Sequence, residues 1–91
     1  MIWYVGETRF VVTSADSAEV SSVTNPSSAV YTIYDIATED VVTSGQATVS
    51  GVYAYFLWAP TTTGGYIADV DYVLGTETKR DRKYIEVKGT I

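Results

Sequence analysis

The chain has 91 residues, an apolar fraction of 46% and a formal net charge of −5, which indicates one domain over residues 1–91 and argues against intrinsic disorder. It contains no cysteine and no histidine, so disulfides, thiolate-bound metal clusters and a Ser-His-Asp triad are excluded. The aromatic set of eight Tyr and two Trp, together with many Val, favours strands over helices.

The N-terminal residues include two neighbouring aromatic side chains, Trp3 and Tyr4, before the first glycine. Two interpretations stay open for them. Exposed aromatic anchors of this kind often contact another protein, and a short edge strand that folds back onto the domain would instead bury them. No stretch resembles a signal peptide or a membrane-spanning helix, so we expect the chain to remain in the cell unless it leaves as part of a particle.

Alternating apolar and polar residues predict the next elements. Residues 8–14 form the first long strand, with Phe10 and Val12 on one face and Val11 and Thr13 on the other. Residues 15–28 are rich in small polar side chains and predict a long loop, with room for a short edge segment, that ends at the Asn25-Pro26 turn signal. Residues 29–36 form the next strand, and its two partly apolar faces suggest neighbours on both sides.

The polar turn after that strand contains Asp35, Glu39 and Asp40. Calcium accepts such oxygen ligands from loops, but the spacing is not that of an EF-hand, and polar turns contain acidic residues for ordinary reasons. We therefore expect a solvated turn, with no metal and no cofactor. Residues 41–50 then predict two short strand pieces, interrupted at Ser44-Gly45.

Two further strands follow in the middle of the chain. The first runs from Val52 to Trp58 and is closed by Pro60. The aromatic rings available to stack on sugars are Trp3, Tyr4, Tyr53, Tyr55 and Trp58, although most are needed for the core of a protein with so few leucines. The second strand shows the clearest alternation, and its core-facing residues are Tyr66, Ala68, Val70, Tyr72 and Leu74.

Asp69 and Asp71 share the opposite face of that strand, which we expect to face water. A carboxylate pair is the best remaining option for catalysis in a chain without histidine. However, side chains two apart on one strand point the same way, whereas two-carboxylate mechanisms need groups that converge across a substrate. We therefore expect no catalytic residues and no enzyme activity.

Five of the six basic residues lie between residues 77 and 88. Nucleic-acid binding needs a broad basic surface, so this concentration predicts no nucleic-acid partner. The run from Lys79 to Lys83 could contact an anionic partner locally, but a solvated turn that protects the adjoining strand is favoured. Residues 83–91 form the last strand, with Ile85 and Val87 inward. About seven short strands with regular turn signals predict an antiparallel sandwich.

Five segments carry a resemblance to a known class of domain. They read VGETRFVVT, VYTIYD, GVYAYFLWAP, GGYIADVDYVLG and YIEVK, and they cover roughly residues 5–88. This order resembles the immunoglobulin-like sandwich modules of tailed-phage structural proteins and bacterial surface proteins. The resemblance implies an all-β, immunoglobulin-like antiparallel β-sandwich without a disulfide. It also implies a structural corner at Gly65 and Tyr66, in which the tyrosine hydroxyl bonds back to the backbone, with Ala68 where antibody-type domains carry a cysteine.

The resemblance also implies a function. We expect a non-enzymatic structural or protein-interaction module, encoded by a phage or prophage and incorporated in its particle. Its partners would be other proteins, including phage structural proteins or a second copy of the chain, and not nucleic acid, a membrane or a small molecule. The alternative is a carbohydrate- or surface-binding domain that belongs to a larger exported bacterial adhesin.

Overall fold

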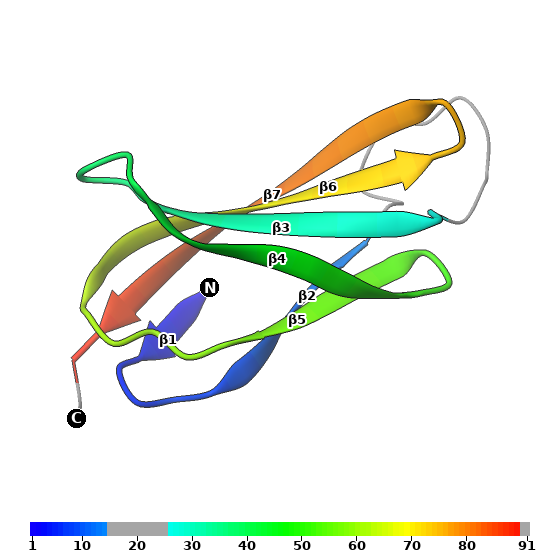
Figure 1. Cartoon of the computed structure of the whole chain (residues 1–91). Coiled ribbons are helices and arrows are strands. Elements are labelled where there is room, and N and C mark those ends of the chain that lie inside the picture. Colours follow the sequence, from blue (N-terminus) through cyan, green and yellow to red (C-terminus); the bar gives the residue numbers. More distant parts are fainter. Residues whose placement is uncertain (15–25, 90–91) are drawn as a thin grey trace.

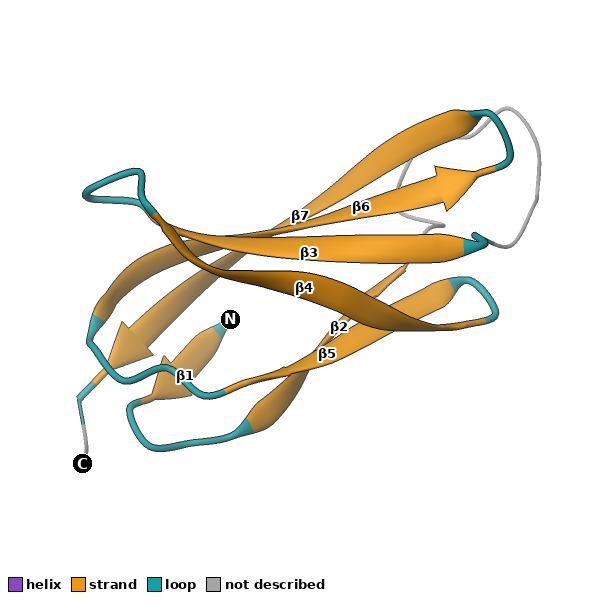
Figure 2. Ribbon diagram, in the orientation of Figure 1, coloured by secondary structure: helices purple, strands orange, loops and turns teal. Residues whose placement is uncertain are grey.

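The computed structural model describes residues 1–14 and 26–89, and these residues form β-strands and no helix (Figure 2). The seven strands are β1 (Ile2–Tyr4), β2 (Arg9–Ser14), β3 (Ser28–Asp35), β4 (Val41–Ser50), β5 (Tyr53–Trp58), β6 (Gly64–Leu74) and β7 (Glu77–Lys88). The expected all-β class with about seven strands is therefore confirmed. Most of the loop expected at residues 15–28 lies outside the described residues.

The strands form one continuous sheet in the order β1-β7-β6-β3-β4-β5-β2, which curls into a half-barrel (Figure 1). Neighbouring strands run antiparallel, with one exception: β1 lies parallel to β7 and pairs Ile2 with Glu86 and Tyr4 with Lys88. The expectation of a purely antiparallel sandwich is wrong on this point. The sheet is mixed, because the chain enters and leaves the sheet along the same edge in the same direction.

Strand β4 carries the sheet round its bend. Its first part pairs with β3 up to Ala47, and residues 48–50 pair with β5. The expected interruption at Ser44-Gly45 is wrong, because β4 is continuous over ten residues. Gly45 has a packing reason instead: a Cβ at this position would lie 3.0 Å from the hydroxyl oxygen of Tyr31.

The core fills the concave side of the curled sheet and is largely aromatic. The Tyr31 ring stacks on Phe56 with 3.9 Å between centroids and so joins β3 to β5 across the core. Trp58 packs against Trp3 and Tyr66, with centroid distances of 5.3 and 5.1 Å. Large rings bury much apolar surface per residue, which explains how a chain with so few leucines builds a core.

Strand β7 begins at Glu77, and every residue of β6 from Gly64 to Leu74 has a partner on it. The basic run from Lys79 to Lys83 is therefore strand, and its interpretation as a solvated turn is wrong. Ile85 and Val87 are buried, as expected for inward-facing residues. On β2 the inward residues are Val11 and Thr13, so that Phe10 and Val12 face outward.

Candidate functional site

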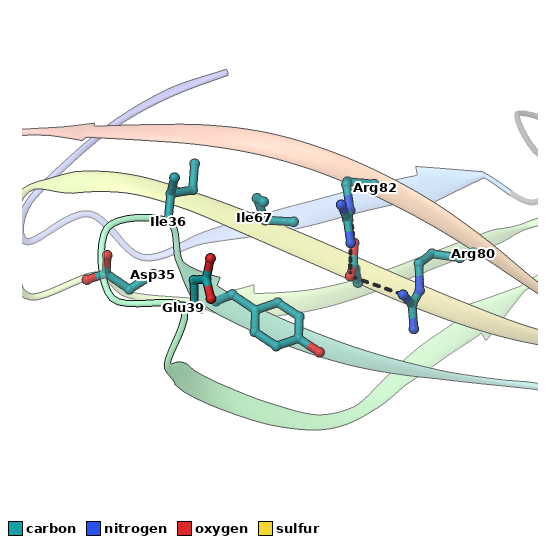
Figure 3. Close-up of a pocket in the computed structure, with 8 residues that line it drawn as sticks. Asp35, Ile36, Glu39, Ile67, Arg80 and Arg82 are labelled. Carbon is teal, nitrogen blue, oxygen red and sulfur yellow. Dashed lines mark hydrogen bonds and ion pairs between the residues drawn. The ribbon is translucent and has the colours of Figure 1, made fainter.

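An open hollow of about 340 Å³ lies on the outer face of the sheet, opposite the core (Figure 3). It forms where β3, β6 and β7 meet the turn between β3 and β4. Its lining residues are Tyr34, Asp35, Ile36, Glu39, Ile67, Asp69, Arg80 and Arg82. The hollow therefore combines an apolar floor with charged groups of both signs.

The two aspartates of β6 each face an arginine on β7. The Nε and Nη2 atoms of Arg82 donate hydrogen bonds of 2.7 and 2.9 Å to the two carboxylate oxygens of Asp69. Arg80 donates bonds of 2.7 and 3.2 Å to Asp71 in the same way, and its Nη1 lies 3.6 Å from Asp69 Oδ2. These are direct cross-strand pairs, since Asp69 lies opposite Arg82 and Asp71 opposite Arg80 in the register.

The exposure of the two carboxylates differs sharply. The side chain of Asp71 is 33% exposed, whereas that of Asp69 is only 2% exposed. The expectation that both aspartates face water is therefore wrong for Asp69. It points outward, as the alternation requires, but the guanidinium groups of Arg82 and Arg80 cover it. Each carboxylate accepts a bidentate pair of hydrogen bonds from one arginine, and Arg80 also reaches Asp69.

This pairing decides what the hollow can do chemically. The hydrogen bond to Asp69 raises the pKa of Arg82, and the hydrogen bond to Asp71 raises the pKa of Arg80. Both guanidinium groups therefore stay protonated, and each gives two of its five N–H donors to a carboxylate. The two bidentate pairs clamp β6 to β7.

The acidic turn between β3 and β4 is held by local hydrogen bonds. Asp35 Oδ1 accepts a bond of 2.9 Å from the backbone N–H of Ala37, and the backbone N–H of Glu39 donates to the Asp35 carbonyl oxygen at 2.8 Å. Glu39 adopts a φ of 63° to close the turn. Within residues 1–14 and 26–89, no group of three acidic side chains is placed to hold a metal ion.

A second polar cluster lies inside the half-barrel and was not anticipated from the sequence. The hydroxyl groups of Thr13 and Tyr72 are hydrogen-bonded to each other across the core. Burial raises the pKa of the Tyr72 hydroxyl, and the nearby negative charge of Asp81 acts in the same direction against the opposing effect of the Thr13 hydrogen bond. The Oδ2 atom of Asp81 is buried without a hydrogen-bond partner.

The residues of the expected structural corner lie at the start of β6. The hydroxyl of Tyr66 donates a hydrogen bond of 2.9 Å to the Thr62 carbonyl oxygen, and the residue is 2% exposed. Ala68 is fully buried on the same face. A Cβ on Gly65 would lie 3.2 Å from Cδ1 of Ile36, so this glycine allows the turn between β3 and β4 to approach.

The aromatic residues that were candidates for surface contacts differ in how far they are buried. Trp3 is 1% exposed and belongs to the core, in agreement with the short edge strand and not with an exposed anchor. Tyr4 is half-buried beside it. Trp58 is also buried, so neither tryptophan offers a face to a sugar ring, whereas Tyr53 is 54% exposed.

An exposed apolar surface lies on the outward side of β2 and β5, and we call it the β2–β5 outer face. It consists of Phe10, Val12, Tyr53, Tyr55 and Leu57. All except the half-buried Tyr55 are more than 50% exposed. Phe10 lies opposite Leu57 and Val12 opposite Tyr55, and the rings of Phe10 and Tyr55 meet edge to face at 5.5 Å.

This face has an unusual charge environment for an acidic protein. Strands β4 and β5 contain no charged residue, and β2 contains only Arg9. The guanidinium of Arg9 lies over the Trp3 ring, 4.5 Å from its centroid, on the opposite side of the strand from Phe10. The alternation of residues 9–14 indicated that Phe10 and Val12 share a face, but only the fold reveals that this face is outward.

The chain matches no protein-family model and no curated protein sequence. Among the described residues, none forms a helix long and apolar enough to cross a membrane. A function must therefore be inferred from the chemistry of the surfaces of the domain.

Proposed function

We propose that the chain is a non-enzymatic protein-interaction module with an immunoglobulin-like fold, which serves as a small structural or assembly component of a phage or prophage particle. The observation that carries the proposal is the β2–β5 outer face. Large contiguous apolar patches are rare on monomeric proteins and mark sites of interaction. Four of the five side chains on this face are more than half exposed.

The chemistry of the face defines the kind of partner that it fits. It has no formal charge, and its polar atoms are the two tyrosine hydroxyls of Tyr53 and Tyr55. Aromatic residues are enriched in protein interfaces, and charged residues are depleted from interface cores. The partner surface is therefore another protein with an apolar, uncharged patch, and an ionic or highly polar ligand fits poorly.

Three features support the immunoglobulin-like assignment. Tyr66 enters β6 after a tight turn and bonds back to the Thr62 carbonyl oxygen, which is the arrangement of a tyrosine corner. The first strand lies beside the last at one edge of the sheet. Strand β4 links a larger group of strands to the β5–β2 pair, and the core lies between these two parts.

The pairing of charged groups supports a non-enzymatic role. The hollow on the outer face of the sheet holds its arginines in ion pairs with Asp69 and Asp71. Catalysis by a carboxylate or a lysine needs a group that is available to exchange a proton within reach of a substrate. The assignment to a particle rests on the resemblance of the five sequence segments to tailed-phage modules.

Incorporation into particles tests this function directly. Particles are purified from a strain that encodes the chain, and their proteins are identified by mass spectrometry. We expect the chain at a constant stoichiometry relative to the main particle proteins. A Val12→Glu variant should be lost from the particles, whereas Val42→Glu, which adds the same charge at a site of similar exposure on β4, should be retained. Purified particles without the wild-type chain would rule out the structural role.

One observation favours a second candidate function, carbohydrate or surface binding. The exposed ring of Tyr53 and the half-buried ring of Tyr55 are two residues apart on β5 and therefore point to the same side. Aromatic faces stack on sugar rings. A glycan array with wild-type chain and a Tyr53→Ala variant distinguishes this candidate, which predicts binding that the substitution abolishes.

A further inference from the structure

We propose that the partner seated on β2 is a second copy of this chain, and that the two β2 strands pair antiparallel about a two-fold axis at Val11. The pairing joins two half-barrels into one longer sheet. The inference rests on the proposed function, because it names the occupant of the same apolar region.

The first argument concerns the edge itself. β2 is the last strand in the sheet order, and within the described part of the chain it pairs only with β5. Natural edge strands are protected by lysines, prolines, bulges or short length. Within Arg9–Ser14, β2 has no lysine, proline or bulge: it runs six residues in unbroken register, and its one charged residue is the inward-facing Arg9 at the first position. The opposite edge, β1, is only three residues long.

The second argument concerns charge. The chain carries a net charge of −5, so two copies repel each other wherever their acidic surfaces meet. The end of the sheet formed by β4, β5 and β2 contains no acidic residue. The paired β2 strands themselves would therefore bring no carboxylates together. A two-fold interface must be complementary to itself, and the apolar stretch from Phe10 to Val12 meets that requirement.

The faces of β2 define the register. Directly opposed residues of antiparallel strands share one face of the sheet, so inward Val11 must meet an inward residue of the second copy. A two-fold axis at Val11 places Val11 opposite Val11 of the other copy. It also gives two symmetry-related pairs in which Phe10 of one copy lies opposite Val12 of the other. An axis at Val12 would place Phe10 opposite Ser14, which removes two apolar pairs. A shift of one residue would bring inward side chains opposite outward ones.

The expected complex is modest in size. One strand pair with its flanking side chains lies at the low end of the area of specific interfaces, which begins at about 1,200 Å² in total. We therefore expect a dimer that dissociates on dilution.

Sedimentation equilibrium over a wide concentration range tests the proposal on the purified chain. Wild type should shift from the mass of one chain to that of two as concentration rises. Val12→Glu should raise the dissociation constant about tenfold or more, because it places a carboxylate against Phe10 of the other copy. Val42→Glu adds the same charge outside the pairing strands and should leave dimerisation within about twofold of wild type. The melting temperatures of both variants, measured at low concentration, identify any loss of folding.

The register is tested separately by crosslinking, which is clean because the chain has no cysteine. Phe10→Cys and Val12→Cys variants are oxidised alone and as an equimolar mixture. The mixture should form more covalent dimer than either variant alone, because residues 10 and 12 are opposed. Equal yields would overturn the register.

A wild-type chain that stays monomeric at all concentrations, or a Val42→Glu variant that is as defective as Val12→Glu, would overturn the dimer. Those outcomes differ from failure of the proposed function, which is absence of the chain from particles. A monomeric chain that is incorporated into particles would leave the function intact and assign the face to a different protein.

Discussion

The hydroxyl of Tyr66 lies 2.9 Å from the carbonyl oxygen of Thr62 and donates a hydrogen bond to it. This bond spans the tight entry into β6, while the ring of the same residue packs edge-on against Trp58 at the end of β5. Tyr66 therefore fixes the connection between β5 and β6 from both its polar and its apolar part. Because β5 and β6 lie in different parts of the curled sheet, the connection between them helps to maintain the curvature of the half-barrel.

Replacement of Tyr66 by Phe removes the hydroxyl and keeps the ring. We expect the free energy of unfolding to fall by about 0.5–1.5 kcal/mol, because the Thr62 carbonyl loses a partly buried hydrogen bond. Urea denaturation followed by fluorescence measures the change. Tyr53→Phe, at a residue that is 54% exposed, is the control and should have little effect. Equal effects of the two substitutions would contradict a special role for Tyr66.

Asp69 and Asp71 should differ in their contribution to stability although each pairs with an arginine. Asp69→Asn should lower the free energy of unfolding by about 1–3 kcal/mol, because its side chain is 2% exposed and loses charge-assisted hydrogen bonds. Asp71→Asn should lower it by at most about 1 kcal/mol, since its carboxylate is 33% exposed. Thermal and urea denaturation of both variants show which substitution lowers stability more. A larger effect of Asp71→Asn than of Asp69→Asn would refute the prediction.

Trp3 should contribute strongly to the stability of the folded domain. Trp3→Ala should cost about 3–5 kcal/mol, as for other large aromatic residues removed from cores, because its ring is 1% exposed and packs on Trp58. The matched control is Ile2→Ala on the same strand, where the side chain is 49% exposed. Urea denaturation measures both. A stable Trp3→Ala variant with altered association would restore the interpretation of this residue as a surface anchor.

The buried Tyr72 hydroxyl should make stability depend on pH at the alkaline end. Its folded-state pKa is raised above the ordinary value of 10.0, whereas in the unfolded chain it titrates near that value. Above about pH 10 the unfolded chain releases this proton while the native chain retains it, so the free energy of unfolding falls as pH rises toward the raised pKa. Below pH 10 the contribution is fully present.

Comparison of wild type with Tyr72→Phe isolates this effect from the other tyrosines. The difference in unfolding free energy between the two proteins should be constant from pH 7 to about pH 9 and should change above about pH 10 in favour of the variant. Urea denaturation at a series of pH values provides the measurement. A difference that stays constant up to pH 11 would contradict the raised pKa of Tyr72.

The strand content could be predicted from the sequence because alternation depends on local residue order. The inward face of β6 from Tyr66 to Leu74 was evident in this way. The run from Lys79 to Lys83 was misjudged because its charge pattern resembles a solvated turn. Its two arginines are balanced in the strand because Asp69 and Asp71 lie opposite Arg82 and Arg80, and that register is a long-range property of the fold.

Gly45 and Phe10 illustrate two other features that could not be predicted from the sequence. A glycine within a run of strand residues reads as a break, but Gly45 is required by the Tyr31 ring that approaches from β3. The alternation of β2 divides its residues into two faces without showing which face meets the core. Since Phe10 and Val12 are as apolar as Val11, only the three-dimensional structure identifies the exposed face that carries the candidate site.

The parallel pairing of β1 with β7 has a consequence for the order of events during synthesis. Trp3 is synthesised before β7, but its cover includes that strand. The indole therefore cannot be fully sheltered until β7 has emerged, and a nascent chain that stops before β7 cannot close its aromatic cluster. A strand made early is thus sheltered late, so this end of the sheet closes only after residues 77–88 have left the ribosome.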